Sequence, residues 1–332
     1  MNEPQIIHRI QQLTRAATTT ANPPPPRHAK QLLLGIGDDC AIYRPRPNQD
    51  LVFTTDFTIE GRHFTTATHT AYDVGYLALA RSLSDLAAMG ATPAFCLVSL
   101  ALPQLRTKSW LPAFYRGLLA LARASGIALA GGDLARSSND DLIVADVMCC
   151  GLVPRGKALT RSGANPGDAI YVTGSLGVSA LGLATHRGAA WKRHLRPQPR
   201  IAVGLALRRL PATAAMDLSD GLSLDLQRMC VASGLDADLT GHNLPIAPGA
   251  TLEQALHGGE DYELLFAASP QKTRVPSTLC GIPITRIGTF HRPRPSRNAA
   301  KPGSITFQAK PLRPLAFDHF APAPNPTVKS TL

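Results

Sequence analysis

Residues 72–101 read YDVGYLALARSLSDLAAMGATPAFCLVSLA, and this stretch decides the class of fold. Its first part, Tyr72–Met89, has the composition of a helix, and Gly90 follows it as is typical after a helix end. Its last part, Phe95–Ala101, is a short apolar run of the kind found in buried strands. A helix followed at once by such a strand indicates a mixed α/β protein.

The same alternation extends in both directions, and a turn-rich segment at 161–168, RSGANPGD, divides it. Since 332 residues exceed one typical domain, we predict an N-terminal α/β domain at 1–155, a C-terminal α/β domain at 156–320 and a polar tail at 321–332. The other predicted strands are Leu51–Thr55, Ile127–Ala130, Leu142–Val153, Ala169–Thr173, Tyr262–Phe266 and Ile282–Phe290. The other predicted helices are Trp110–Ser125, Gly177–Thr185, Ile201–Leu210 and Asp220–Ser233.

Composition excludes several classes of protein. No apolar run approaches the roughly 20 residues of a membrane span, and the polar N-terminus lacks a signal-peptide pattern, so we expect a cytoplasmic protein. The net charge of +11 is scattered and not interleaved with aromatic residues, which argues against nucleic acid and suits anionic substrates. Six cysteines without a C-x-x-C pair predict neither a zinc site nor a disulfide framework.

Carboxylates recur at the ends of predicted elements, often beside glycine. They occur in GIGDDCA (35–41), in TTD (54–56), in SDLAAMG (84–90), in GGD (131–133), in DLSDG (217–221) and in GGEDYE (258–263). Each motif alone has an ordinary structural alternative, such as an acidic turn, a cap by Ser219 or Asp220, or an ion pair between Asp85 and Arg81. Asp85 is the most informative, because a helix C-terminus disfavours a negative charge.

Together these motifs provide oxygen ligands without a Cys/His cluster, which favours Mg²⁺ over zinc. Protein-bound Mg²⁺ usually shares its ligands with substrate phosphates, so the natural chemistry is nucleotide phosphoryl transfer. The chain contains neither a P-loop sequence nor the H-R-D and D-F-G motifs of protein kinases.

Several segments resemble the thiamine-monophosphate kinase family, in the family's order. They are GIGDDCA (35–41), TTD and EGRHF (54–64), SDLAAMGA (84–91), AGGD (130–133), ALTRSGANPGD (158–168), RHLRPQPR (193–200), DLSDG (217–221) and GGEDYELLF (258–266). The resemblance implies two α/β domains of the aminoimidazole ribonucleotide synthetase type. It also implies a homodimer with a joint barrel-like core of N-terminal strands.

The resemblance further implies direct in-line transfer from ATP to thiamine monophosphate, with Mg²⁺ bridging the phosphates. Implied metal ligands are Asp39, Thr54, Thr55, Asp56, Asp85, Asp133, Asp217 and Asp220. Implied ATP contacts are Tyr115, Gly132, Arg161 and Ser219, and implied contacts to thiamine monophosphate are His63, Glu260 and Phe317.

Three alternatives remain at this point. The first is another ATP-dependent synthetase of the same superfamily, against which the segments 193–200 and 258–266 argue. The second is a basic nucleic-acid-binding protein, suggested only by the net charge. The third is an inactive relative that serves as a dimeric scaffold, which the complete aspartate set disfavours.

Overall fold

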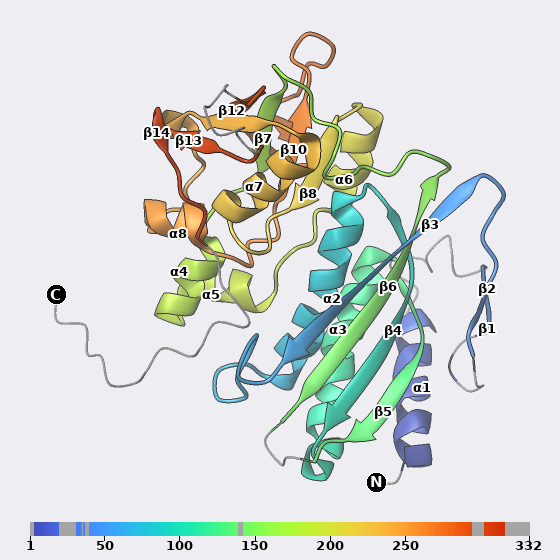
Figure 1. The fold of residues 1–332 in the computed structure, drawn as a ribbon. Coiled ribbons are helices and arrows are strands. Elements are labelled where there is room, and N and C mark those ends of the chain that lie inside the picture. The colour runs from blue at the N-terminus through green and yellow to red at the C-terminus, as the bar shows by residue number, and fades with distance from the viewer. Residues whose placement is uncertain are drawn as a thin grey trace, which may run out of the picture.

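The computed structural model describes residues 3–19, 31–34, 36, 40–138, 142–293 and 302–315. These residues form two large sheets, each with its own helices, and a separate pair of short strands, and the two large sheets are joined through the segment after β6 (Figure 1). In the described ranges, no helix combines the length and the apolar character that crossing a membrane requires.

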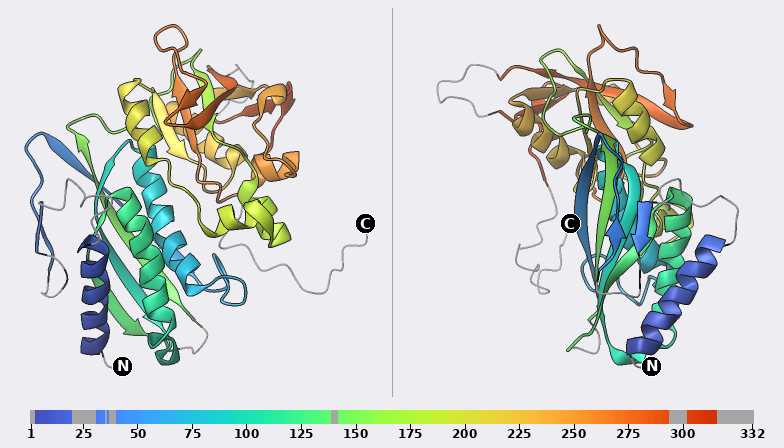
Figure 2. Two further views of the ribbon diagram at one scale, coloured as in Figure 1. Left: turned by 180° about the vertical axis from the view of Figure 1, so that it is seen from behind. Right: turned by 90° about the vertical axis from the view of Figure 1, so that its right-hand side faces the viewer.

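The first sheet has four strands in the order β3 (Gln49–Ile59), β6 (Val144–Pro154), β4 (Thr92–Leu102) and β5 (Ala128–Arg136). Only the β4–β5 pair is parallel. One face is covered by α2 (Ala71–Ala88) and α3 (Trp110–Ser125), with α1 (Glu3–Thr19) beside α3 (Figure 2). The short strands β1 (Leu32–Leu34) and β2 (Ile42–Tyr43) form a separate pair, and η2 (Gln104–Thr107) precedes α3.

The opposite face of this sheet carries no helix of the described chain (Figure 2). Alternation along β3 turns apolar side chains outward here, because successive residues of a strand point to opposite faces. Leu51 is 38% exposed, Phe53 61% and Phe57 56%. We name these three residues and the strands around them the open face.

The second sheet has the order β14 (Lys310–Pro311), β13 (Ile305–Phe307), β9 (Asp236–Leu239), β12 (Ile282–His291), β7 (Ala169–Thr173), β10 (Leu264–Ala268) and β8 (Ala214–Asp217), with β11 (Thr278–Leu279) beside β12. Two helices, α7 (Leu222–Ser233) and α8 (Leu252–His257), pack on one face, and α6 (Ile201–Arg209) packs on the other. The helices α4 (Val178–Thr185) and α5 (Gly188–Leu195) pack against each other, and η3 (Gly241–Asn243) follows β9.

The two halves share an apolar cluster. Ala87 and Ala88 of α2 pack with Val203 and Leu207 of α6 and with Phe266 of β10. The contact between these helices is very close, since a Cβ built at Gly204 would lie 1.9 Å from the carbonyl oxygen of Ala87. The same arrangement joins α2 to α3, where a Cβ at Gly75 would lie 1.9 Å from the carbonyl oxygen of Phe114. Only glycine permits such an approach between helix backbones.

The predicted α/β alternation is confirmed, with four local corrections. The predicted strand at Ile127–Ala130 does not stop at a glycine turn, because β5 continues through Gly131 and Gly132. β10 begins at Leu264 rather than at Tyr262, and several elements were not predicted, among them α5, α8, β8 and β9. α7 begins after Gly221, so neither Ser219 nor Asp220 caps it.

Candidate active site

A cavity of about 780 Å³ lies between the two halves of the molecule. Its N-terminal wall comes from the end of β3, the following loop and α2, and its C-terminal wall comes from α4, the loop after β8 and the loop before β10. Seven residues predicted as site residues line it: Asp56, His63, Asp85, Asp217, Ser219, Asp220 and Glu260. The fold thus brings together carboxylates that lie far apart in the sequence.

A second cavity of about 420 Å³ adjoins the first and shares Asp85 and Asp217 with it. Thr54 and Arg161, two further predicted residues, line this second cavity. The hydroxyl of Thr54 donates a hydrogen bond to Oδ2 of Asp85. Asp85 therefore lies at the junction of the two cavities, next to a strand that provides another oxygen atom.

The geometry of β3 separates the Thr-Thr-Asp residues. Thr54 and Asp56 point toward α2, whereas Thr55 points to the open face and donates to Oδ1 of Asp146 on β6. This follows from the two-residue period of a strand, which places neighbours on opposite sides. The structure therefore places Thr55 outside both cavities.

The clustered carboxylates repel one another. Burial, followed by the charge of Asp85, raises the pKa of Asp217 to about 8. Burial and Asp85 likewise raise the pKa of Asp56 to about 7, although Arg81 opposes this shift. Burial is the larger cause of both shifts and the neighbouring carboxylate adds to it, a combination that is common at functional sites.

The carboxylates of the large cavity fit a Mg²⁺ ion that is shared with substrate phosphates, rather than one held by the protein alone. Within the described residues, no three carboxylate, imidazole or thiolate groups lie close enough to hold one ion by themselves. Protein-bound Mg²⁺ does not need such a cage, because it usually takes one or two carboxylates, several waters and substrate phosphates. Asp56, Asp85 and Asp217, spread around one cavity, match that requirement.

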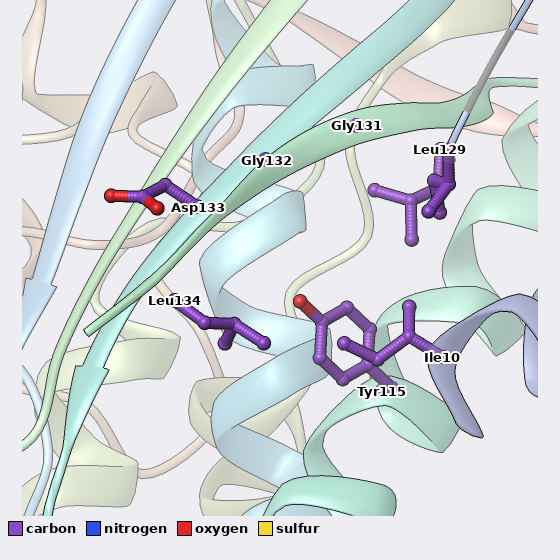
Figure 3. A pocket seen from close by; sticks show the side chains of 8 residues that line it. Ile10, Tyr115, Leu129, Gly131, Gly132, Asp133 and Leu134 are labelled. Atoms are coloured by element: carbon purple, nitrogen blue, oxygen red, sulfur yellow. The ribbon is translucent and has the colours of Figure 1, made fainter. Parts of the chain in front are cut away.

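Three other predicted residues lie elsewhere. Tyr115, Gly132 and Asp133 line a small pocket of about 90 Å³ at β5, together with Ile10 of α1 (Figure 3). Figure 3 shows the ring of Tyr115 on the helix side and the carboxylate of Asp133 pointing away from it. Because β5 and β3 are the two edges of the sheet, this group is separated from the large cavity.

Gly132 has a backbone that only glycine adopts with ease. Its φ is +153°, and a Cβ there would lie 1.9 Å from the carbonyl oxygen of Val98 on β4. Gly132 thus lets β5 lie close to β4, and the two glycines do not form a turn. Asp39 and Phe317, the remaining two predicted site residues, lie outside the described residues.

The loop after β8 is shaped by a carboxylate that sequence reasoning missed. Asp225 is fully buried, and its Oδ2 accepts from the backbone N–H groups of Asp220 and Gly221 at 3.0 and 3.1 Å. Arg228 donates to Oδ1 of Asp225 at 2.8 Å and also contacts Asp220. Asp225 therefore holds Asp220 at the cavity. The sequence feature that could have identified Asp225 is its position four residues after Gly221, in the first turn of α7.

The segments 193–200 and 258–266 contact each other directly. The carboxylate of Glu263 is 2% exposed and accepts from Arg193 at 3.0 Å and from Nε of Arg200 at 2.7 Å. One residue further, Nδ1 of His194 lies 3.7 Å from Oε2 of Glu260 and 2.8 Å from the hydroxyl of Ser179. The first segment thus supports the loop that carries Glu260 into the cavity.

His63 closes the turn after β3. Its Nδ1 accepts from the backbone N–H of Ile59 at 3.1 Å, and its ring lines the large cavity. Beside it, Oε1 of Glu60 accepts from the backbone N–H of Thr66 at 2.8 Å. The loop at one end of the cavity is therefore held by its own side chains, which leaves His63 beside the space where a ligand would bind.

Comparison with known families assigns a class to this arrangement. Residues 37–153 match the family model "AIR synthase related protein, N-terminal domain", and residues 165–291 match "AIR synthase related protein, C-terminal domain". The chain is therefore a two-domain AIR synthase related protein, and the large cavity lies between the two matched regions.

Individual relatives narrow the class. The thiamine-monophosphate kinase of Salmonella typhimurium is 41% identical over 311 residues, which are 86% of this chain and 92% of that protein. The kinase of the same name from Bacillus subtilis is 35% identical and covers 88% of this chain and 95% of its own length. The chain belongs to the thiamine-monophosphate kinase family.

Solved structures agree with this assignment. The thiamine-monophosphate kinase of Stenotrophomonas maltophilia K279a is 34% identical, with a TM-score of 0.78 over 92% of this chain and 97% of that one. AaThiL complexed with AMPPCP and TMP is 29% identical, with a TM-score of 0.73 over 83% of this chain and 89% of that one. The fold described above is thus the fold of these proteins.

Proposed function

We propose that the chain transfers the γ-phosphoryl group of ATP to thiamine monophosphate, forming thiamine diphosphate and ADP. The observation that carries this proposal is the cavity in which Asp56 and Asp85 of one half face Asp217, Asp220 and Glu260 of the other. Family membership supports it, as do the names of the relatives and the AMPPCP and TMP bound by AaThiL.

The chain's own residues position and neutralise the reacting groups. The acceptor phosphate is already largely ionised near neutral pH, so its oxygen attacks the γ-phosphorus without a strong general base. Arg161, at the adjoining cavity, provides a guanidinium suited to phosphate oxygens. Glu260 and His63 lie where the acceptor is expected to bind.

We propose Mg²⁺ as the metal, held by Asp56, Asp85 and Asp217 with Thr54 as a neighbouring oxygen donor. Bound Mg²⁺ would offset the charge of the phosphates during transfer. Asp220 is a candidate ligand for a further ion. A cytoplasmic location follows from the proposed use of ATP, which is available there.

We further propose a homodimer formed through the open face. Phe53 and Phe57 are each more than half exposed on a sheet that no described helix covers, as expected for an association surface. Asp133 lies at the far edge of this sheet, away from the cavity of its own protomer. We therefore propose that Asp133 serves the cavity of the partner subunit, together with Gly132 and Tyr115.

The direct test is an assay for thiamine diphosphate with ATP and thiamine monophosphate, with Mg²⁺ and with EDTA. Product in the first reaction and none in the second is expected. A related synthetase would instead release ADP without any dependence on thiamine monophosphate. ADP release that ignores the acceptor would therefore replace this proposal with the synthetase alternative.

A further inference from the structure

Arg81 is a buried cation inside the acidic cavity. It lies in the interior of α2, its side chain is 14% exposed, and it lines the cavity with Asp56 and Glu260. An arginine in this place either neutralises the carboxylates or binds an anionic ligand. Its hydrogen bonds decide between these two roles.

One terminal nitrogen of Arg81 is fully engaged. Nη1 donates to Oε1 of Glu260 at 3.1 Å and to the hydroxyl of Tyr262 at 3.0 Å. Both partners come from the loop before β10, in the other half of the molecule. Tyr262 is 3% exposed and has a φ of +50°, so this hydroxyl is held in place by a locally strained backbone. The two contacts fix the plane of the guanidinium.

The other donors of Arg81 are not engaged in this way. Nη2 lies 3.8 Å from Oδ1 of Asp56, beyond hydrogen-bond distance, and Nε is buried without a hydrogen-bond partner in the described structure. A guanidinium has five N–H donors, and leaving them buried and unpaired is costly. Nε is too buried to meet a ligand, but Nη2 is fixed in direction and has no hydrogen bond among the described residues, so it is suited to a ligand that accepts hydrogen bonds.

Neutralisation alone does not account for this geometry. An arginine that served Asp56 would form the short, paired contact typical of arginine and carboxylate. The 3.8 Å between Nη2 and Oδ1 of Asp56 is not such a contact, whereas Nη1 lies 3.1 Å from Oε1 of Glu260. The position of Arg81 is thus set by Glu260 and Tyr262 rather than by Asp56.

We propose that Arg81 is a phosphate-binding residue for the acceptor substrate and that Glu260 and Tyr262 position it. The inference rests on the proposed function, since thiamine monophosphate is the acceptor there. The acceptor is favoured over ATP because Arg81 bonds to Glu260 in the large cavity, whereas Arg161 lines the adjoining one. A guanidinium presents two parallel donors to phosphate oxygens, which a single ammonium cannot do.

The test compares two ligands that differ only in the phosphate. Binding of thiamine monophosphate and of thiamine is measured by calorimetry on the full chain with Mg²⁺ and without nucleotide. Arg81→Met is expected to weaken the binding of thiamine monophosphate at least about tenfold, as for loss of a charged hydrogen bond. The affinity for thiamine is expected to stay unchanged. The affinity of Arg81→Lys for thiamine monophosphate is expected to lie between those of Arg81→Met and the wild type.

The matched control is Arg196→Met, which removes an arginine paired with Asp73 at 2.6 Å outside the cavity. Both affinities are expected to stay at the wild-type value. Equal weakening of both ligands by Arg81→Met, or no weakening of either, would overturn the inference. If the wild type forms thiamine diphosphate in that case, only this inference fails, whereas absence of product removes the proposed function itself.

Tyr262→Phe provides a second measurement that does not remove the charge. It deletes the hydroxyl that accepts from Nη1 and leaves Arg81 in place. The affinity ratio of thiamine monophosphate to thiamine is expected to fall several-fold. An unchanged ratio in a folded Tyr262→Phe protein contradicts the positioning role, and this variant decides the matter if Arg81→Met does not fold.

Discussion

The hydroxyl of Thr54 on β3 donates a hydrogen bond to the carboxylate of Asp85 on α2, 31 positions away. This bond joins the edge strand to the helix at the point where the two cavities meet. It also orients the carboxylate of Asp85 at the edge of both cavities. The first prediction follows from this relationship.

Asp85→Asn should lower the turnover of thiamine monophosphate by roughly 100-fold or more, since loss of a metal-held charge is worth several kcal/mol. The fold should persist, because the amide oxygen still accepts from Thr54 and because repulsion with Asp56 and Asp217 is removed. Steady-state kinetics and the melting temperature without metal provide the measurements. Asp50→Asn, outside both cavities, is the control, and near-normal turnover in Asp85→Asn would exclude the metal role.

Mixed dimers should test the proposed place of Asp133. Asp85→Asn and Asp133→Asn should each be inactive alone, but heterodimers of the two should regain activity, because one of their two sites then has both carboxylates. The measurement is turnover after mixing and re-equilibrating the two variants. If Asp133 serves its own protomer, each heterodimer has one defect in each site and no activity returns.

Phe57→Glu should separate the proposed dimer into monomers. A charge on the open face would be buried without a partner on association, which costs several kcal/mol. Sedimentation velocity at micromolar concentration should show the shift from dimer to monomer. Leu105→Glu, at a position 85% exposed on η2, is the matched control and should leave the sedimentation coefficient unchanged.

His194 should make stability depend on pH on the acid side. Burial, then His69 and His186, lower the pKa of His194 to about 4, against roughly 6.5 in an unfolded chain. Between these values the unfolded chain binds a proton that the folded chain does not, so stability falls as the pH is lowered from 6.5. At pH 5 this amounts to about 2 kcal/mol.

His194→Gln keeps a hydrogen-bonding group for Ser179 and removes the titration. Its unfolding free energy, from urea melts at pH 7 and pH 5, should decrease less than that of the wild type over the same interval. His242→Gln, at an exposed position, should behave like the wild type. Identical pH dependence in His194→Gln and wild type would contradict the assignment.

Gly204→Ala should destabilise the protein by about 1–3 kcal/mol, as an overpacked contact does. The added methyl would meet the carbonyl oxygen of Ala87, which belongs to a helix backbone and cannot move aside. Gly131→Ala is the comparison, since its added methyl meets only the Leu97 side chain, at 3.2 Å. Equal melting temperatures of the two variants would mean that α2 and α6 tolerate separation.

The sequence predicted the local features of the site better than its assembly. Asp85 was expected to need a partner because of its place at a helix end, and the structure provides Thr54 in β3 rather than Arg81. That partner could not be predicted, because it depends on which strand lies beside α2. Similarly, the segments 193–200 and 258–266 were noted separately, and only the fold joins Arg193 to Glu263.

The position of Asp133 is a second feature that the sequence alone could not predict. Its glycine-rich motif looks like the other aspartate motifs, so sequence alone places it with them. The order of strands in the sheet, β3-β6-β4-β5, then sets it at the opposite edge from Asp56. Strand order is a non-local property that residue spacing does not contain.

The backbone contact between Gly204 and Ala87 constrains how this molecule moves. A hinge needs a joint that can open, but here the backbones of α2 and α6 meet directly at Gly204, within the apolar cluster that the two halves share. Because α2 carries both Arg81 and Asp85, the direct contact between α2 and α6 also sets the width of the cavity. Substrate entry and product release must then take place while the two halves keep their relative orientation.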